Sequence, residues 1–245
     1  LNRQQLAAAD KSQLKDILVS FCGDASMQKF MAAQMNGASL DKKIFILDAM
    51  NACEIKEVPQ SWVSQLEKEL TSNADATVKL SVLKFIRLHG VASLNKALGQ
   101  VADNSQNSTL LRVSAIGTSV NDSTQLSEKH FDYLYTQLQP GNDASIRQQV
   151  ASVLGQTRLS NAQLLKIANE FLGKADAFIL PRLTPLFRGA SDVSIGTALA
   201  GALEKSPGLD NISEKDLVEM FSKYPSKLDA SKEKLMTQLK SARSE

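Results

Sequence analysis

The chain has 245 residues and a formal net charge of +2, so its bulk charge gives no sign of a nucleic-acid-binding or membrane-surface protein. Hydrophobic residues make up 43% and charged residues 22%, as in ordinary soluble globular proteins. Ala, Leu, Ser, Lys and Gln dominate over 12 Gly and 6 Pro, and this balance favours helix over sheet.

The start of the chain carries no targeting signal. No apolar run approaches the roughly 18 residues of a membrane span. Residues 1–5 lack the apolar core of a signal peptide. Because the chain does not begin with Met, we expect an excised fragment or a mature product of a longer parent.

In chain order, the first half shows apolar residues at intervals of three and four, which predict amphipathic helices separated by polar or glycine-containing breaks. These helices are predicted over residues 11–22, 24–35, 40–53, 59–70, 75–89, 94–101 and 110–116. The residues predicted to face the core in the first and third helices are Leu14, Ile17, Leu18, Phe21, Leu40, Ile44, Leu47 and Met50. Asp24 and Asp75 are expected N-caps.

The second predicted helix has a methionine-rich stripe formed by Met27, Phe30, Met31 and Met35. Such a stripe has two interpretations. It can form an adaptable binding groove, because methionine is flexible and polarizable, or it can be ordinary core.

The second half continues the pattern, with helices predicted over residues 127–138, 143–155, 160–173, 178–187, 192–203, 213–224 and 228–242. Pro181 and Pro185 predict a short or kinked helix between residues 178 and 187. Ile195, Leu199 and Leu203 form the apolar stripe of the next helix. Small residues beside that stripe leave room for close helix packing.

An internal repeat links these helices. A polar residue is followed three positions later by an aliphatic one, with further apolar residues at steps of four. The copies begin at Asp75, Ser108, Asp143 and Asp192, with a weaker copy at Gly37 and Leu40. The aliphatic residues lie 33 to 49 positions apart, a range that indicates HEAT- or armadillo-type helix pairs. We therefore predict an all-α protein, an α-α superhelix of such pairs, forming a single domain over residues 1–245.

Two details of the repeat stand out. A basic residue follows the aliphatic one in three copies, as Lys79, Arg112 and Arg147. The copy that starts at Asp192 has Gly196 at this position. We expect that surface to be covered, with the preceding proline-bearing helix as the candidate.

No catalytic, cofactor or metal site is predicted. Cys22 and Cys53 are interpreted as small buried side chains, and a disulfide between them is the alternative. His89 lies at a helix end, where a cation would suit the dipole, and His130 lies in the first turn of a helix. No c-type haem motif, HExxH motif, Walker loop, dinucleotide fingerprint or nucleophile elbow is present.

The remaining charged groups are interpreted as solvated surface. This applies to the acidic pairs Glu67 with Glu69 and Glu214 with Asp216. The segment 228–245 is predicted to be a basic C-terminal helix, and contact with an acidic partner or a following domain is the alternative. The basic residues near the C-terminus are Lys223, Lys227, Lys232, Lys234, Lys240 and Arg243.

A more specific signal lies between residues 159 and 225. It is carried by Leu159–Leu165, Leu180–Leu183, Pro185–Phe187, Ser191–Gly196, Ala202–Leu209 and Leu217–Pro225. This block resembles the helical-repeat region of bacterial multidomain haem-binding proteins described as membrane-bound dehydrogenases. In that family a β-propeller precedes the HEAT repeats and a cytochrome c-like domain follows them.

The resemblance implies a non-catalytic scaffold, spacer or docking module inside a larger, exported protein. The c-type haem would belong to a domain following residue 245, and we expect this chain itself to hold no cofactor. Expected partners are neighbouring domains or another protein, with no nucleic acid and no membrane insertion. One alternative is a free-standing adaptor that binds a peptide on a concave surface. Another is an enzyme resembling HEAT-like bilin lyases.

Overall fold

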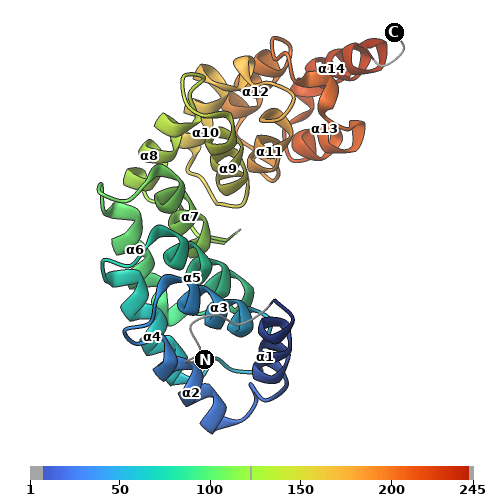
Figure 1. Ribbon diagram of the computed structural model, residues 1–245. Helices are drawn as coiled ribbons and strands as arrows, with labels where there is room; N and C mark the ends of the chain where they lie inside the picture. Colours follow the sequence, from blue (N-terminus) through green and yellow to red (C-terminus); the bar gives the residue numbers. More distant parts are fainter. Residues whose placement is uncertain (1–7, 122, 243–245) are drawn as a thin grey trace. The chain divides into compact units, whose positions relative to one another are not determined.

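The computed structural model describes residues 8–121 and 123–242 (Figure 1). Within those ranges the chain is built from α-helices and short 3-10 turns, and the one extended pairing is an isolated parallel bridge between Gln125 and Arg158. The prediction of an all-α fold is confirmed. The chain forms two compact units, Leu1–Ser119 and Val120–Glu245, and each is described separately below. The superhelix and the single domain stay predictions.

The first unit contains seven α-helices within its described residues. They are α1 (Ala8–Ser20), α2 (Ala25–Met35), α3 (Leu40–Asn51), α4 (Gln60–Thr71), α5 (Ala76–His89), α6 (Asn95–Asp103) and α7 (Thr109–Ser119), with the 3-10 turn η1 (Ala92–Leu94) before α6. They form two layers. One layer contains α2, α4 and α6, and the other contains α1, α3, α5 and α7. The pairs α2–α3, α4–α5 and α6–α7 each pack across the two layers, an arrangement also found in HEAT-type helix pairs.

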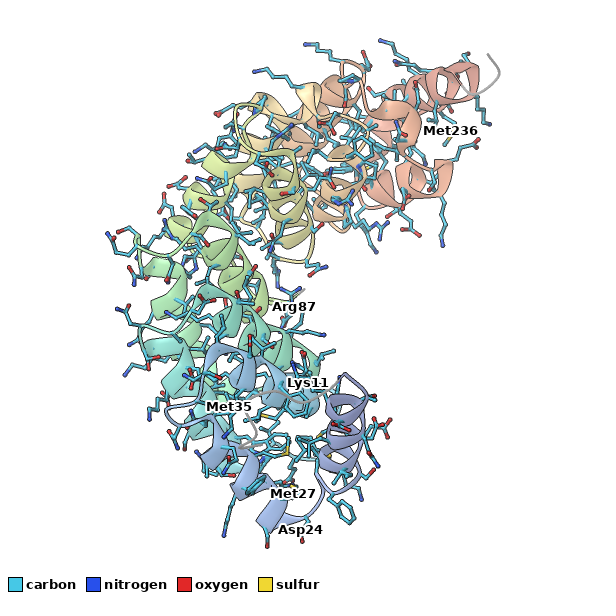
Figure 2. All side chains as sticks on the ribbon, in the orientation of Figure 1. Lys11, Asp24, Met27, Met35, Arg87 and Met236 are labelled. Carbon is cyan, nitrogen blue, oxygen red and sulfur yellow. The ribbon has the colours of Figure 1, made fainter. Side chains whose placement is uncertain are left out.

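Local sequence signals set the helix ends in this unit. Asp24 caps α2 by accepting hydrogen bonds from the backbone N–H groups of Ser26 and Met27, as predicted. Gly37 ends the same helix with φ 64°, a left-handed conformation that favours glycine. Figure 2 labels Asp24 and Met35 at the two ends of α2. Met31 and Met35 are fully buried, so this part of the methionine stripe is core.

The second unit contains α8 (Glu128–Leu138), α9 (Ala144–Gly155), α10 (Asn161–Glu170), α11 (Leu180–Leu183), α12 (Val193–Leu203), α13 (Glu214–Phe221) and α14 (Asp229–Ala242). Four 3-10 turns join them: η2 (Leu172–Lys174), η3 (Thr184–Phe187), η4 (Leu209–Asn211) and η5 (Ser226–Leu228). α10, α12 and α14 pack in one row. α9, α11 with η3, and α13 pack in a second row. The two prolines shorten α11, as predicted.

The N-caps of the second helices of successive pairs give the true register of the repeat. These caps are Ser39, Asp75, Ser108, Asp143, Asp176 and Ser213, each following the previous one after 33 to 37 residues. The N-cap of α11 itself is Ile179, but Asp176 begins the helical turn before it and accepts hydrogen bonds from Phe178 N and Ile179 N, as an N-cap does. This regular period was hidden in the sequence because α11 is broken by proline.

The new register corrects two predicted copies. The weak copy begins at the cap Ser39, so Leu40 is the first residue of α3 and is 45% exposed. Leu40 therefore does not face inward. The copy at Asp192 is also wrong, because α12 packs beside α10 in the other row of helices. The equivalent copy starts instead at Asp176.

Several other apolar residues predicted on helix faces are exposed. In the first helix Leu18 is buried, whereas Ile17 and Phe21 are 45% and 59% exposed, so only part of the predicted face packs inward. Phe30 of the methionine-rich stripe is exposed as well. Periodicity identifies a face of a helix but not how much of it the neighbouring helices cover.

Gly196 is covered, as predicted, but by a different part of the chain. A Cβ atom at this position would lie 2.8 Å from Tyr224 Cδ1 and closer still to Leu228 Cδ1. The covering residues therefore follow α13 in sequence. The proline-bearing helix before α12 is not what covers this glycine, which corrects that part of the prediction.

This contact leads to a prediction on stability. Gly196→Ala is expected to lower the free energy of unfolding by about 1–2 kcal/mol, because overpacking outweighs the gain of alanine in a helix. At Gly201, on the same helix, an added Cβ atom would meet no neighbouring atom within 4 Å, so Gly201→Ala is the matched control and is expected to add up to about 1 kcal/mol. Urea unfolding followed by circular dichroism measures both. Equal effects of the two substitutions would contradict the packing argument.

Candidate functional site

The corrected repeat places a basic residue at the fourth position after the cap in four consecutive copies. These residues are Lys43, Lys79, Arg112 and Arg147. The fourth position after an N-cap is one helical turn inside the helix, so each cation lies close to the loop that joins the two helices of its pair. What each cation contacts differs between copies, and this difference defines the candidate site.

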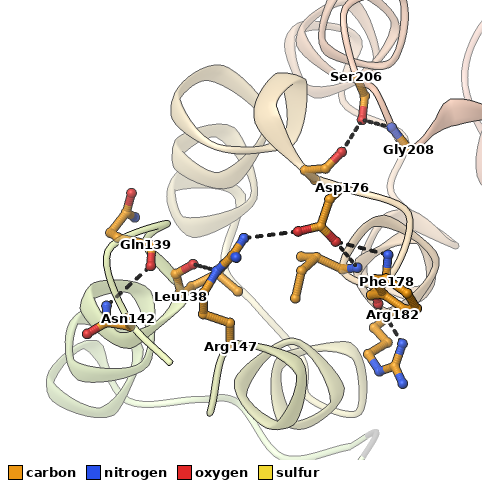
Figure 3. Close-up of polar contacts among 11 residues, drawn as sticks. Leu138, Gln139, Asn142, Arg147, Asp176, Phe178, Arg182, Ser206 and Gly208 are labelled. Carbon is orange, nitrogen blue, oxygen red and sulfur yellow. Dashed lines mark hydrogen bonds and ion pairs between the residues drawn. The ribbon is translucent and has the colours of Figure 1, made fainter. Parts of the chain in front are cut away.

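Arg147 shows how such a cation binds an anion (Figure 3). Its Nε donates to the carbonyl of Leu138, the last residue of α8, at 3.2 Å. Its Nη2 lies 3.3 Å from Asp176 Oδ2, a carboxylate supplied by the cap of the next copy. One side chain therefore stabilises the end of the preceding helix and binds a carboxylate.

The loop that carries Asp176 is held in position by residues after α12. Ser206 Oγ donates to the Ala175 carbonyl at 2.8 Å, and Gly208 N donates to the same carbonyl at 3.2 Å. A side chain at Gly208 would collide with the backbone of Asp176, since a Cβ would lie 2.6 Å from its carbonyl oxygen. The carboxylate beside Arg147 is thus part of a fixed structure.

Lys43 also has a carboxylate partner. Its Nζ lies 2.8 Å from Glu69 Oε2 on α4, and Gln65 Nε2 donates to the other carboxylate oxygen at 2.8 Å. The Glu69 side chain is only 3% exposed. The prediction that Glu69 belongs to a solvated face is therefore wrong, because its side chain is buried and paired with Lys43, whereas Glu67 is exposed as predicted.

Arg112 uses its guanidinium as Arg147 does. Its Nε donates at 2.8 Å to the carbonyl of Ala102, near the end of α6. In these two copies the arginine satisfies a carbonyl that the end of the preceding helix leaves without a helix partner.

Lys79 differs from the other three. The residue is only 7% exposed, yet its side chain makes no hydrogen bond or ion pair with any described residue. It lines a hollow of about 560 Å³ between the α4–α5 loop and the α6–α7 loop, together with Thr71, Asn73, Asn104 and Ser108. A buried cation without a partner is costly, and it is therefore the strongest candidate for a binding group in this unit.

The electrostatics of the hollow agree with this assignment. Burial lowers the pKa of Lys79 below the usual value for a lysine. An anion placed beside the ammonium group would favour its charged form and so would oppose this shift. No described acidic side chain lines the hollow.

The two cysteines predicted to be buried are buried, and the structure brings them together. Cys53 Sγ donates to the Ala49 carbonyl at 3.2 Å, and the Cys22 thiol interacts with it. Burial, and then the contact with Cys22, raises the pKa of the Cys53 thiol. Both are free thiols, without the disulfide bond considered as the alternative.

Because the thiolate is the reactive form, both thiols are expected to be protected in the folded protein. Iodoacetamide at pH 8 should label them far more slowly than it labels the chain unfolded in urea, with mass spectrometry as the readout. Cys53→Ala should leave Cys22 protected from the reagent, since Cys22 is itself only 4% exposed. Rapid labelling of the native protein would show that α1 separates readily from α3.

The histidines occupy structural positions. His89 packs on the Phe85 ring at a centroid distance of 4.3 Å, and its Nε2 is buried without a hydrogen-bond partner among the described residues. Burial lowers the pKa of His89, which favours the neutral ring over the cation expected at that helix end. His130 lies in the first turn of α8, where its backbone N–H donates to Ser127 Oγ at 3.3 Å. The described residues contain no group of three or more His, Cys, Asp or Glu side chains suited to a metal ion.

Several of the other charged groups form ion pairs near the surface. Asp216 accepts from Ser213 Oγ at 2.6 Å and pairs with Arg188. The hydrogen bond from Ser213 is the main cause of its lowered pKa. Lys234 pairs with Glu204 at 2.7 Å, and Lys240 lies 3.8 Å from Glu214. Lys223 and Lys227 are exposed, Lys232 is half-buried, and Arg243 lies outside the described residues.

Comparison with known proteins gives no relative from which a function could be transferred. No protein-family model, curated protein or solved structure matches the chain. None of the described helices is both long and apolar enough to cross a membrane.

The repeat pattern shows a basic residue at Lys79, Arg112 and Arg147, but it does not predict a site there. The pattern alone gives the same residue class in each copy. Only the structure shows that Arg147 has a carboxylate within reach and that Lys79 has none among the described residues.

Proposed function

We propose that the chain is a non-catalytic helical-repeat docking module that binds a partner protein, or a neighbouring domain of a longer parent, at the loops joining its helix pairs. The observation that supports this most directly is the polar hollow between the α4–α5 and α6–α7 loops. It lies between two successive repeats, and stacked repeats are well suited to presenting such surfaces to other proteins. Loops held by a rigid helical array are common sites of binding.

The wider setting is a proposal that rests on the resemblance of residues 159–225. In that setting the module belongs to a larger, exported haem-binding protein of the dehydrogenase-like class. The haem and the redox chemistry belong to other domains, and this chain contributes position and contact. A free-standing adaptor would use the same hollow in the same way.

Site-specific photo-crosslinking tests the docking function. A benzophenone amino acid is placed at Gln106, an exposed residue lining the hollow, or at Gln238, an exposed residue of α14 that serves as control. We expect Gln106 to capture one defined protein or domain, identified by mass spectrometry. The purified partner should then bind the unmodified chain with one-to-one stoichiometry in calorimetry. Equal capture from both positions, or no binding by the purified partner, would overturn the proposal.

A further inference from the structure

We propose that the hollow around Lys79 is a carboxylate-binding site that receives an acidic side chain, aspartate or glutamate, from the partner protein. This inference rests on the proposed docking function and names the chemistry that the docking surface recognises. It is carried by a comparison between copies of the repeat within the chain.

The equivalent cations of the repeat differ in whether they have a carboxylate partner. The cation one turn after the cap has a carboxylate in contact in at least two copies, as in Lys43 with Glu69 and Arg147 with Asp176. The chain thus uses this position to bind a carboxylate more than once. Lys79 occupies the same position, is buried as well, and has no such partner among the described residues.

The carboxylate that pairs with Arg147 comes from a position that a serine occupies near Lys79. Asp176, which pairs with Arg147, is the cap of the following copy. The cap of the copy following Lys79 is Ser108, which lines the same hollow as Lys79. Serine and aspartate both serve as N-caps, so this position keeps its capping role but supplies no carboxylate.

Polar groups surround the hollow that Lys79 lines. Ser108 Oγ accepts from Leu111 N at 3.3 Å, which leaves its hydroxyl hydrogen able to donate to an incoming oxygen. Asn73 and Asn104 also line the hollow and carry amide groups. The volume of about 560 Å³ accommodates an acidic side chain together with part of its backbone. A carboxylate there would gain a charge-assisted hydrogen bond from a cation that burial has already partly desolvated.

Three peptides test the assignment on the full chain. They are blocked Gly-Glu-Gly, its uncharged counterpart Gly-Gln-Gly, and Gly-phosphoserine-Gly. Binding is followed by two-dimensional amide NMR. We expect the glutamate peptide to shift amides of residues 72–79 and 104–111, and the glutamine peptide to leave them unchanged. Tighter binding of the phosphoserine peptide would overturn the carboxylate assignment in favour of phosphate.

Variants locate the binding group. Lys79→Met keeps the aliphatic stem and removes the charge, and it should weaken the glutamate peptide at least about tenfold. Lys84→Met is the matched control, because Lys84 is exposed on the same helix. Unchanged affinity in Lys79→Met, or an equal loss in Lys84→Met, would overturn the proposal.

A second pair of variants keeps the test valid if Lys79→Met folds poorly. Ser108→Asp restores the arrangement of Asp176, so it should bring a carboxylate to Lys79 and abolish binding of the glutamate peptide. Ser108→Asn also caps the helix but carries no charge, and it should retain binding. Retained binding in Ser108→Asp would contradict the comparison between copies.

The two proposals fail in different ways. If the captured partner binds Lys79→Met as tightly as the unmodified chain, the carboxylate site is wrong and the docking function stands. If the glutamate peptide binds as expected but Gln106 captures no partner, the docking function is wrong.

Discussion

Lys43→Met is expected to lower the free energy of unfolding of the first unit by about 3 kcal/mol, toward the lower end of the range seen when one partner of a buried ion pair is removed. The reason is the environment of Glu69, whose side chain is 3% exposed. Without Lys43, its carboxylate keeps only the hydrogen bond from Gln65. The Lys43 side chain is 20% exposed, which is why we expect a loss at the lower end.

The fluorescence of Trp62 measures this effect, because it is the single tryptophan of the chain and lies within the first unit. Lys79→Met is the matched comparison, since the substitution, the helix position and the layer are the same. Because Lys79→Met removes a buried cation that has no partner among the described residues, it should leave the free energy of unfolding of the unit unchanged or should raise it. Equal destabilisation by the two substitutions would mean that the two lysines have the same role, and it would remove the basis for a carboxylate-binding site at Lys79.

Trp62→Ala is expected to lower the free energy of unfolding by about 3–5 kcal/mol, as for other large buried aromatic residues. Trp62 is fully buried and packs edge-on against Phe85 at a centroid distance of 5.8 Å. Its Nε1 donates to the Gln28 carbonyl of α2 at 2.8 Å, so truncation leaves a cavity and also removes a hydrogen bond to a part-buried helix carbonyl. Circular dichroism in urea measures the loss.

Trp62→Phe separates the two contributions. Phenylalanine keeps most of the ring packing but has no N–H group, so the substitution should lower the free energy of unfolding by about 1 kcal/mol for the lost hydrogen bond, plus a small packing term. A loss below about 1 kcal/mol for Trp62→Ala would contradict the view that α2, α4 and α5 meet in one packed core around this side chain.

The two stability predictions bear on the proposed function. A docking surface made of loops keeps its geometry only if the helices beneath it are held firmly. Trp62 contacts α2 and α5, and the Lys43–Glu69 pair joins α3 to α4. Both therefore support the α4–α5 pair, whose loop forms one side of the hollow around Lys79.

The positions of most helices could be predicted because their signals are local. Asp24 and Asp75 cap the helices that follow them, Gly37 and Gly90 end helices with positive φ, and prolines shorten the segment around α11. Each of these depends on a few neighbouring residues.

The candidate site was not predictable from such signals, because it depends on distance between residues far apart in sequence. Lys79, Arg112 and Arg147 look alike in the repeat, and Glu67 and Glu69 look alike as an acidic pair. Packing decides that Glu69 is buried beside Lys43 and that Asp176 reaches Arg147. The proline break likewise concealed Asp176 as the fifth cap.

The all-α class and most helix ends follow directly from the amino-acid sequence, since periodicity, caps and breakers act within one or two turns of chain. The pairing of helices into layers, the covering of apolar faces and the different partners of the four equivalent cations emerge only when the helices pack. Burial and ion pairing depend on what neighbouring elements bring to the same place. In this chain, Lys79 shares its hollow with the serine cap Ser108, whereas Arg147 contacts the aspartate cap Asp176.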